Sequence, residues 1–486
     1  MTNRKFLDKA EQLKQPLIET VLTCEGSDRV LKDGDEIVFD MGKHCVGYTE
    51  IRLSSVGHHP DAPLLMSVQF AEIAKELEQD TGSYQGWISP SWIQEERVHV
   101  DVIPGTVSFS RRYSFRYIKI RVINVSDNYS VRVDGIRVKT VSSADRTKLI
   151  PSGLSGKDKL LDDISVNTLH ACMQEVFEDG PKRDRRMWLG DLRLEALADY
   201  VTFRNTDLVK RCLYLFAGTT LEEGRLANNL FLYPEVECDF QTMFDYTLFY
   251  INTLWDYYRE TGDRETLEEL EPVCVRQYEL LRDCFDKNGL IDLNKAGNIF
   301  VDWNFDLDKT ACGQAIYVYA LKDLLKMERE LGEETGELEA EIRNKEEAAQ
   351  TMYDPGKGLY VSGEKKQVSV ASQMWMVLAG IASGDRAGEI LMNVLEESEA
   401  VALNSPYAYH FLIKALLDAG LKDEAYQRMV SYWGAMADQG ADTFWEIFNP
   451  EDPYFSPYGG IVVHSFCHAW SCTPAYFLRK YYSQEQ

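Results

Sequence analysis

The feature that most constrains the fold of this chain is a change in the period of its hydrophobic pattern near residue 150. Up to about residue 145, apolar and polar residues alternate over short stretches bounded by Gly, Asn, Asp and Ser, which is typical of β-strands. In YIKIRVINV, one inward face would carry Ile118, Ile120, Val122 and Val125. Such one-sided strands favour an antiparallel sandwich. A helical segment, FAEIAKELEQ, interrupts the region.

From about residue 156, apolar residues recur three and four positions apart, which predicts helices separated by short turns. We count about twelve such helices before residue 482, without the constant repeat length that would indicate a solenoid. Twelve helices in pairs would form an (α/α)6 barrel. We therefore predict a β-sandwich domain over residues 1–147 and an (α/α)6-barrel catalytic domain over residues 148–486, with one central pocket.

Charge and composition exclude several classes of function. The 52 basic and 78 acidic side chains give a formal charge of −26, which repels nucleic-acid phosphates. No stretch reaches the roughly 20 apolar residues of a membrane span, and the N-terminus lacks the apolar core of a signal peptide. The ten cysteines include no C-x-x-C pair, so we expect free thiols and a cytoplasmic protein. We expect neither a nucleic-acid nor a membrane partner, and a homo-oligomer stays open.

The densest polar cluster is DGPKRDRRMWLGD, residues 179–191, in a loop just before a predicted helix. It combines three carboxylates, a guanidinium and an aromatic ring: Asp179, Arg183, Asp184, Trp188 and Asp191. Glycoside cleavage needs one carboxylic acid to protonate the leaving oxygen and a second carboxylate to activate water. Neighbouring charges can set the pKa values that these two roles require. The alternative is an exposed charged loop whose aspartates cap the next helix.

A second cluster, GADTFWEIFNP, places Glu446 between Trp445 and Phe448, an apolar setting that suits a general base. The alternative is a glutamate at a helix end beside two core aromatics. In HSFCHAWS, His464 and His468 are four residues apart on a predicted helix. This is metal-ligand spacing, but without an HExxH pattern or a cysteine pair we favour a sugar contact or a core histidine and predict no metal site.

Two weaker signals remain. FVDWNFDLDK places Asp302 beside Trp303 before a helix, where a capped turn with a core tryptophan is the alternative. ECDFQTMFDY places Asp239 and Asp245 near the start of a long helix; Asp239 could be an N-cap, whereas Asp245 would need a partner if buried. The sequence contains no P-loop, GxGxxG fingerprint or GxSxG elbow, so we expect no cofactor.

These clusters together resemble glycoside hydrolase family 78, the α-L-rhamnosidases. DGPKRDRRMWLGD resembles the family signature D-C-P-x-R-[DE]-x-x-x-W-x-G-D, and GADTFWE resembles its G-A-T-T-x-W-E segment. FVDWNF, HSFCHAW and the strand segment FDMGKHCVGYTEIRL also match family segments, and all five follow the family order. The chain differs from the family pattern at three places. It has Asp at the position of the general acid, Gly180 where the motif has a cysteine, and WEIFNPED where W-E-R-W is commoner. It also ends shortly after its last predicted helix, where family members usually continue into a C-terminal β-domain.

The resemblance implies an inverting glycosidase in which Asp184 is the general acid and Glu446 the base. It implies that the sugar pocket is lined by Asp179, Arg183, Trp188, Asp191, Asp245, Trp303, Trp445 and His468. The carboxyl groups of Asp184 and Glu446 would then be about 6.5 to 9.5 Å apart. The leading hypothesis is removal of a terminal α-L-rhamnosyl or related residue from a carbohydrate or glycoside substrate. The alternatives are another glycosidic bond in the same pocket, or a non-catalytic sugar-binding protein of the same fold.

Overall fold

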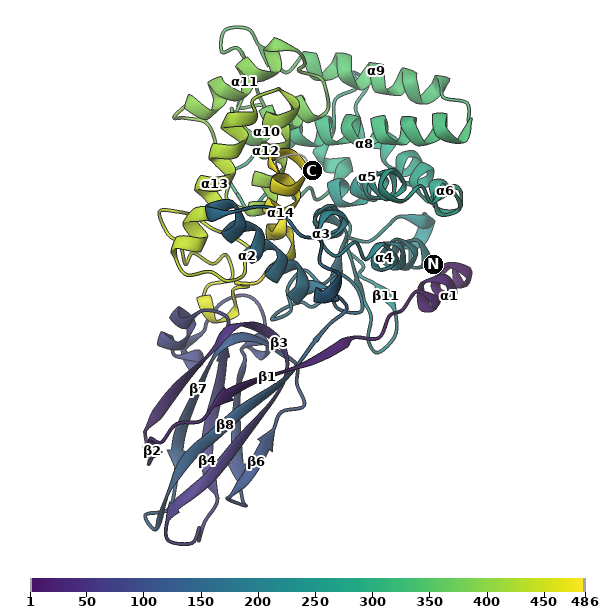
Figure 1. The fold of residues 1–486 in the computed structure, drawn as a ribbon. Helices are drawn as coiled ribbons and strands as arrows, with labels where there is room; N and C mark the ends of the chain where they lie inside the picture. Colours follow the sequence, from purple (N-terminus) through teal and green to yellow (C-terminus); the bar gives the residue numbers. More distant parts are fainter. Residues whose placement is uncertain (1, 484–486) are drawn as a thin grey trace.

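The computed structural model describes residues 2–483. A β-domain, built from the early part of the chain, forms the lower end of the molecule in Figure 1, and a helical domain forms the upper end. The predicted fold class, a β-sandwich followed by an (α/α)6 barrel, is confirmed. None of the helices within residues 2–483 combines the length and the apolar character that crossing a membrane requires.

The β-domain contains eight antiparallel strands, and most of them follow the order β1-β8-β3-β7-β4-β5. The long strand β3 pairs with β7 through its first half and with β8 through its second half, so that it belongs to both layers of the sandwich. The strands are β1 (Ile18–Glu25), β2 (Val30–Leu31), β3 (Glu36–Gly57), β4 (Leu64–Ala71), β5 (Glu95–Val100), β6 (Gly105–Ser108), β7 (Tyr113–Asn124) and β8 (Tyr129–Ser142).

The core of the β-domain follows the predicted alternation. Ile118, Ile120, Val122 and Val125 are all buried in it. The segment predicted as a helix, FAEIAKELEQ, contains only the short 3₁₀ turn Ala74–Glu78. Two more 3₁₀ turns follow, at Thr81–Ser83 and Pro90–Trp92, and this irregular stretch between β4 and β5 faces the helical domain.

The helical domain consists of paired helices around a central axis. The helices are α2 (Gly156–Cys172), α3 (Leu189–Val201), α4 (Thr206–Gly218), α5 (Phe244–Thr261), α6 (Arg264–Leu281), α7 (Leu293–Ala296), α8 (Thr310–Leu331), α9 (Gly336–Gln350), α10 (Val370–Leu378), α11 (Asp385–Glu396), α12 (Pro406–Asp418), α13 (Lys422–Asp438) and α14 (Pro474–Phe477). Short strand pairs lie in the connecting loops: β9 (Met187–Trp188) with β10 (Asn229–Phe231), β10 with β11 (Glu237–Cys238), and β12 (Tyr353–Asp354) with β13 (Leu359–Tyr360).

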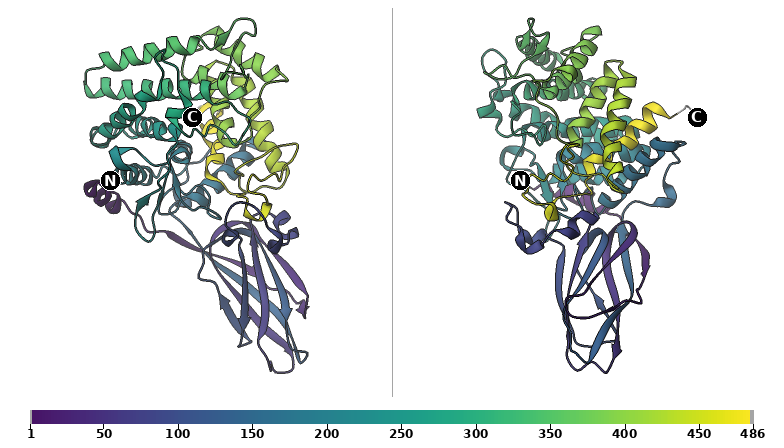
Figure 2. Two further views of the ribbon diagram at one scale, coloured as in Figure 1. Left: turned by 180° about the vertical axis from the view of Figure 1, so that it is seen from behind. Right: turned by 90° about the vertical axis from the view of Figure 1, so that its left-hand side faces the viewer.

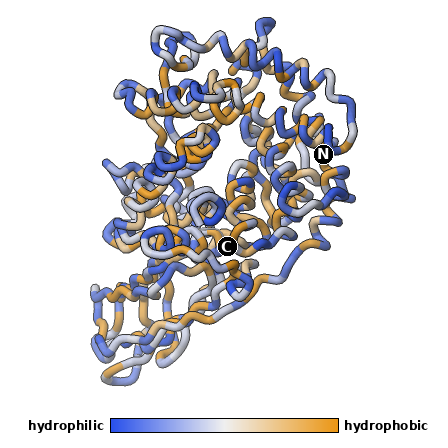
Figure 3. Tube along the Cα trace, turned by 45° about the horizontal axis from the view of Figure 1, so that its top comes forward, coloured by the Kyte–Doolittle hydropathy of each residue, from blue (hydrophilic) through white to orange (hydrophobic). Residues whose placement is uncertain are grey.

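An inner ring and an outer ring of helices make the barrel. Within the inner ring, α3 packs against α5, α5 against α8, α8 against α10 and α10 against α12, and the segment Ala469–Phe477 closes the ring between α12 and α3. Each inner member has an outer partner: α4, α6, α9, α11, α13 and α2. Inner helices such as α10 are buried all round, which their apolar sequences allow. Figure 2 shows the ring from two further directions, and Figure 3 shows hydrophobic residues concentrated inside it.

Two further local features differ from what the sequence led us to expect. The segment around His464 and His468 is not a helix, because its backbone bonds to another part of the chain: the Glu446 amide donates to the Ser465 carbonyl (3.1 Å) and the His468 amide to the Phe444 carbonyl (2.9 Å). The helix α1 (Arg4–Gln12) was not expected, and it packs against α4 of the helical domain rather than against the sandwich.

Candidate active site

The sequence clusters converge on one cavity at the end of the barrel that faces the β-domain. Its volume is about 440 Å³, within the range of about 300 to 1,000 Å³ that is usual for small-ligand sites. All predicted site residues except Asp245 and Trp445 line it. The complete lining is Trp87, Ile88, Ser89, Trp92, Asp179, Arg183, Asp184, Arg186, Trp188, Asp191, Asp239, Gln241, Met243, Tyr246, Phe300, Trp303, Glu446, Tyr458, His468 and Trp470.

Backbone hydrogen bonds hold the three main clusters together. The Ala469 amide donates to the Asp179 carbonyl (2.7 Å), which ties the loop before α3 to the segment that closes the inner ring. That segment is also bonded through the Ser465 carbonyl and the His468 amide to residues 444–446, as described above. The side chains of the three clusters therefore have fixed positions relative to one another, although about 260 residues separate the first cluster from the second.

Arg183 lies between the two candidate catalytic carboxylates. Its guanidinium bonds to Glu446, lies 3.7 Å from an Asp184 oxygen and stacks over the Tyr458 ring at 4.1 Å. Its Nε donates to the Val463 carbonyl (2.9 Å), which fixes the plane of the guanidinium. Because one planar guanidinium reaches both carboxylates, their nearest oxygens are at most about 8 Å apart.

Glu446 is almost completely buried beside the cavity. Its carboxylate accepts hydrogen bonds from Arg183 and from the Tyr458 hydroxyl. Burial raises the pKa of Glu446 above its usual value; Arg183 and Tyr458 oppose this shift, and the negative charge of Asp184 adds to it. The carboxylate is sheltered from bulk water, and the neighbouring cation favours its ionised form. Such a group can accept a proton from a water molecule in the cavity.

Asp184 is held in an unusual backbone conformation. Asp184 and Arg185 have φ angles of 62° and 54°, in the left-handed region that side chains other than glycine rarely adopt. The Arg185 guanidinium donates to the Arg112 carbonyl (2.7 Å) of the β-domain, and Arg112 pairs with Glu178 (2.6 Å) at the start of the same loop. These contacts hold the strained turn. The Asp184 side chain remains 22% exposed, more than the other carboxylates of the loop.

A second group of polar side chains surrounds His468. One ring nitrogen lies 3.6 Å from Asp191, and the other lies 4.0 Å from both Asp179 and Glu446. Burial lowers the pKa of His468 well below its usual value, so the imidazole is neutral. Burial also raises the pKa values of Asp179 and Asp191 well above the usual range. This side of the cavity therefore offers neutral donors and acceptors, which suit sugar hydroxyls.

Several buried polar atoms of the lining find no hydrogen-bond partner within residues 2–483. They are the indole nitrogens of Trp188 and Trp303, Asp191 Oδ1 and His468 Nδ1. An unpaired buried polar group costs about 1 to 3 kcal/mol. All four lie in the lining of the same cavity, so this cost falls at the site.

Asp245 and Trp445 were expected to contact the sugar, but neither lines the cavity. The Asp245 carboxylate accepts the backbone N–H groups of Phe300 (3.0 Å) and Val301 (2.9 Å), so it holds the loop that carries Phe300 and Trp303. Burial raises its pKa, and these backbone bonds oppose the shift. Trp445 is fully buried and packs against Phe466 with ring centroids 5.0 Å apart, behind Glu446.

Sequence reasoning missed part of the lining. Asp239 was considered only as a possible N-cap, whereas Tyr458 and the β-domain residues Trp87 and Trp92 were not singled out. Gly190 of the WLGD motif could have indicated close packing at this position. A Cβ at this position would lie 2.4 Å from the Tyr246 ring, so glycine lets this ring reach the cavity wall.

Helix α3 carries Asp191, Glu195 and Asp199 at intervals of four residues, and all three are buried. Burial raises the pKa of Asp199 from 3.8 to about 7. Between these values the folded protein retains a proton that the unfolded chain has lost, so the free energy of unfolding falls as pH rises through this window. The contribution of Asp199 to this loss is about 4 kcal/mol.

We therefore expect Asp199→Asn to lose less stability than the wild type between pH 4.5 and 8, because the amide does not ionise. Urea unfolding at a series of pH values measures the difference. The matched control is Asp127→Asn, a change at an exposed aspartate. Its free energy of unfolding should depend on pH in the same way as that of the wild type. If the free energies of unfolding of Asp199→Asn and wild type changed with pH in parallel, the raised pKa of Asp199 would be contradicted.

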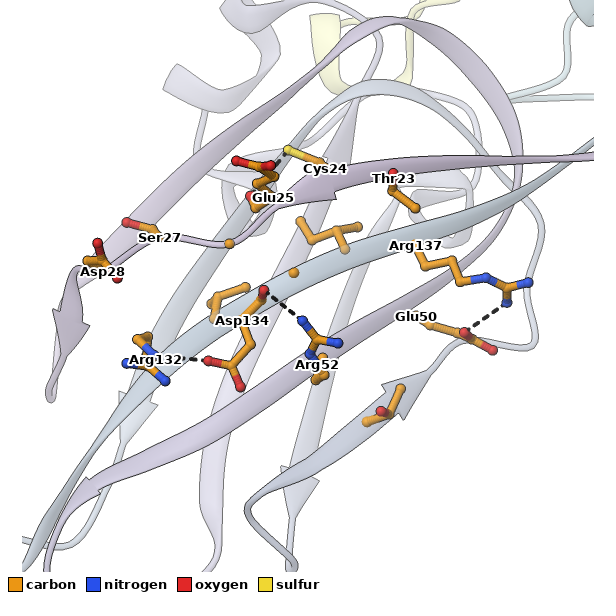
Figure 4. Close-up of a pocket in the computed structure, with 15 residues that line it drawn as sticks. Thr23, Cys24, Glu25, Ser27, Asp28, Glu50, Arg52, Arg132, Asp134 and Arg137 are labelled. Carbon is orange, nitrogen blue, oxygen red and sulfur yellow. Dashed lines mark hydrogen bonds and ion pairs between the residues drawn. The ribbon is translucent and has the colours of Figure 1, made fainter.

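A larger hollow lies on the β-domain, far from this chemistry (Figure 4). It is open and has a volume of about 950 Å³. Its charged side chains neutralise one another, as in Arg132 with Asp134 (2.9 Å) and Arg137 with Glu50 (3.1 Å), and they are partly exposed. Within residues 2–483, no cluster of three or more His, Cys, Asp or Glu side chains could hold a metal ion. All ten cysteines are free thiols.

A helical barrel with a carboxyl-lined central cavity indicates the class of glycosidases. Comparison with family models makes this specific. Residues 156–482 match the bacterial alpha-L-rhamnosidase 6 hairpin glycosidase domain, and residues 8–140 match the glycosyl hydrolase family 78 alpha-rhamnosidase N-terminal domain. The chain therefore belongs to glycoside hydrolase family 78 and is a glycosidase, not the non-catalytic protein that its sequence left open. The domain boundary at residues 147 and 148 remains a prediction.

Solved structures agree with this assignment. A rhamnosidase from Klebsiella oxytoca with rhamnose bound is 40% identical, with a TM-score of 0.94 and 99% of each chain covered. The family 78 rhamnosidase of Bacillus sp. GL1 shares the fold at 22% identity, with a TM-score of 0.77 over 93% of this chain and 47% of that one. The Streptomyces avermitilis α-L-rhamnosidase complexed with L-rhamnose does so at 17% identity, with a TM-score of 0.70 over 96% and 44%. No curated protein matched the sequence.

Proposed function

We propose that this glycosidase removes a terminal α-L-rhamnosyl residue from a glycoside by an inverting mechanism. Asp184 protonates the glycosidic oxygen, and Glu446 takes a proton from the water molecule that attacks the anomeric carbon. The observation that carries the proposal is the placement of Arg183 between these two carboxylates at the cavity wall. Support for rhamnose comes from the Klebsiella oxytoca rhamnosidase, which is similar over the whole chain and has rhamnose bound.

The geometry of the pair allows inversion. In an inverting enzyme the two carboxyl groups are about 6.5 to 9.5 Å apart, which leaves room for a water molecule. The upper bound of about 8 Å set by Arg183 is compatible with this spacing. Arg183 also keeps Glu446 available as a base, because its positive charge opposes the effect of burial on the pKa of that carboxyl. His468, Asp179 and Asp191, which line the cavity, would hold the sugar hydroxyls.

Two measurements test the proposal. Release of p-nitrophenol from p-nitrophenyl α-L-rhamnopyranoside, beside a panel of other aryl glycosides, identifies the sugar. Proton NMR of the first product then reports its configuration before mutarotation. We expect turnover of the rhamnoside and β-L-rhamnose as the first product. Turnover of another glycoside alone would contradict the assignment to rhamnose, and α-L-rhamnose as the first product would contradict inversion.

A further inference from the structure

The inner and outer parts of the cavity differ in chemistry. The inner part carries the carboxyl groups, Arg183 and His468, all of which are nearly completely buried apart from Asp184. The outer wall, which we define as Trp87, Ile88, Ser89 and Trp92, comes from the β-domain. It contains two indoles, one aliphatic side chain and a single hydroxyl, with no charged or amide side chain.

The outer wall is firmly attached to the catalytic segment around Tyr458. The Trp87 indole donates to the Pro457 carbonyl (2.7 Å), and the Tyr84 hydroxyl donates to the Tyr458 carbonyl (2.8 Å). Gly86 lies so close to this segment that a Cβ would be 1.8 Å from the Tyr458 carbonyl oxygen. Figures 1 and 2 show the short turns of the β-domain against the last, yellow part of the chain.

Trp87 is nevertheless 69% exposed. Its hydrogen bond holds the indole in place although the ring is exposed to solvent. The ring therefore presents a flat apolar face, and a ligand that binds to it pays little entropy for ordering the side chain. Two more exposed aromatic rings lie beside lining residues: Phe240, 82% exposed, follows Asp239, and Phe305, 81% exposed, contacts the Trp303 ring at 6.0 Å. Of these three exposed rings, that of Trp87 lines the cavity itself.

The position of Asp184 connects this apolar wall with the leaving group. In the proposed function, Asp184 protonates the oxygen that joins the sugar to its leaving group, so the leaving group lies beyond Asp184 on the side away from Glu446. Asp184 is the most exposed carboxyl group of its loop. Its neighbour Arg185 has its guanidinium 6.0 Å from the Trp92 ring. Trp92 of the outer wall is thus close to the loop that carries the acid, and Trp87 lies at the exposed rim of the same cavity.

We propose that the β-domain forms the leaving-group subsite and that Trp87 is a specificity-determining residue favouring a flat aromatic aglycone. This inference rests on the proposed function. A sugar leaving group would need hydrogen-bonding side chains to hold its hydroxyls. The β-domain side of the cavity supplies only Ser89, whereas the polar lining residues Arg186, Asp239 and Gln241 come from the helical domain. An aromatic ring needs a flat apolar partner, which the indole of Trp87 provides.

The test compares Trp87→Ala with wild type on 4-methylumbelliferyl α-L-rhamnopyranoside and on methyl α-L-rhamnopyranoside. For each substrate, the ratio of variant to wild-type kcat/KM cancels the intrinsic reactivity of the leaving group. We expect the aryl substrate to lose about tenfold more than the methyl substrate, mainly through KM, because only the aryl ring can stack on the indole. Trp87→Phe keeps a flat ring and should restore most of the loss.

The matched control is Tyr233→Ala, because Tyr233 is an aromatic residue of similar exposure, 67%, outside the cavity lining. It should leave both ratios near one. Equal losses on the two substrates, or a larger loss on a rhamnosyl disaccharide than on the aryl substrate, would overturn the inference and leave the proposed function intact. Failure of the wild type to hydrolyse any rhamnoside would instead contradict the proposed function, and this inference with it.

Discussion

Replacement of Glu446 by glutamine is expected to lower kcat by about 10²- to 10⁴-fold, the usual contribution of general base catalysis. Glutamine has the same shape but cannot accept a proton from the attacking water. The side chain would keep a carbonyl oxygen for Arg183 or Tyr458, which bond to the two carboxylate oxygens in the wild type, so the cavity should persist. Steady-state hydrolysis of the rhamnoside measures the loss, and urea unfolding verifies the fold.

Asp184→Asn separates the two proposed roles. An acid is needed most when the leaving group is poor, so Asp184→Asn should lose much more activity on methyl than on p-nitrophenyl α-L-rhamnopyranoside. Glu446→Gln should lose similar amounts on both, because water activation is required in each case. Glu451→Gln, a change at an exposed glutamate nearby, is the matched control and should keep wild-type activity. The reverse pattern for the two variants would exchange the roles, and retained activity in both would contradict the mechanism.

The general architecture was predictable because it depends on local periodicity. The alternation around Ile118 and Ile120 and the recurrence of apolar residues after residue 156 are properties of single elements, and burial follows them closely. The 179–191 motif was recognisable because its polar residues are close in sequence. The helical prediction for the segment around His468 failed because tertiary backbone bonds to Phe444 and Glu446 replaced the local ones.

The outer wall could not be predicted, because its place at the cavity depends on how the two domains pack. Nothing in the local sequence around Trp87 distinguishes a loop against a catalytic segment from a surface loop. For Asp245, the sequence instead predicted a sugar contact that the structure does not show. Its type and position suited a sugar contact, yet the backbone of Phe300 and Val301 uses its oxygens, which only the folded chain reveals.

The same domain packing supports the catalytic loop through a buried charge cluster of Lys182, Glu72, Glu76 and His44. The Lys182 ammonium bonds to Glu76 and to the His464 carbonyl (2.8 Å), and lies 3.9 Å from Glu72. Glu72 accepts the Phe466 amide (2.7 Å). Burial opposes protonation of His44, but Cys467, Glu72 and Asp442 together raise its pKa to about 9. Burial raises the pKa of Glu76 to about 7; Lys182 opposes this shift and Glu72 adds to it.

Lys182→Met is therefore expected to lower the free energy of unfolding by about 3 to 5 kcal/mol, because it leaves buried carboxylates without their cation. The loss should be larger at pH 8 than at pH 5.5. At the lower pH Glu76, whose pKa is about 7, is mostly protonated and needs no cation. Urea unfolding at the two pH values measures both effects.

A double variant tests whether the charge pair is the cause of this loss. Lys182→Met/Glu76→Gln removes the cation and the carboxylate that bonds to it, so it should recover part of the stability at pH 8. Lys480→Met is the matched control, because Lys480 is a partly exposed lysine whose ion pair with Glu260 (3.5 Å) lies at the surface. It should cost less than about 1 kcal/mol, as surface pairs usually do. A double variant no more stable than Lys182→Met at pH 8 would show that the pair with Glu76 is not the source of the loss, and that the bond from the Lys182 ammonium to the His464 carbonyl holds the catalytic loop instead.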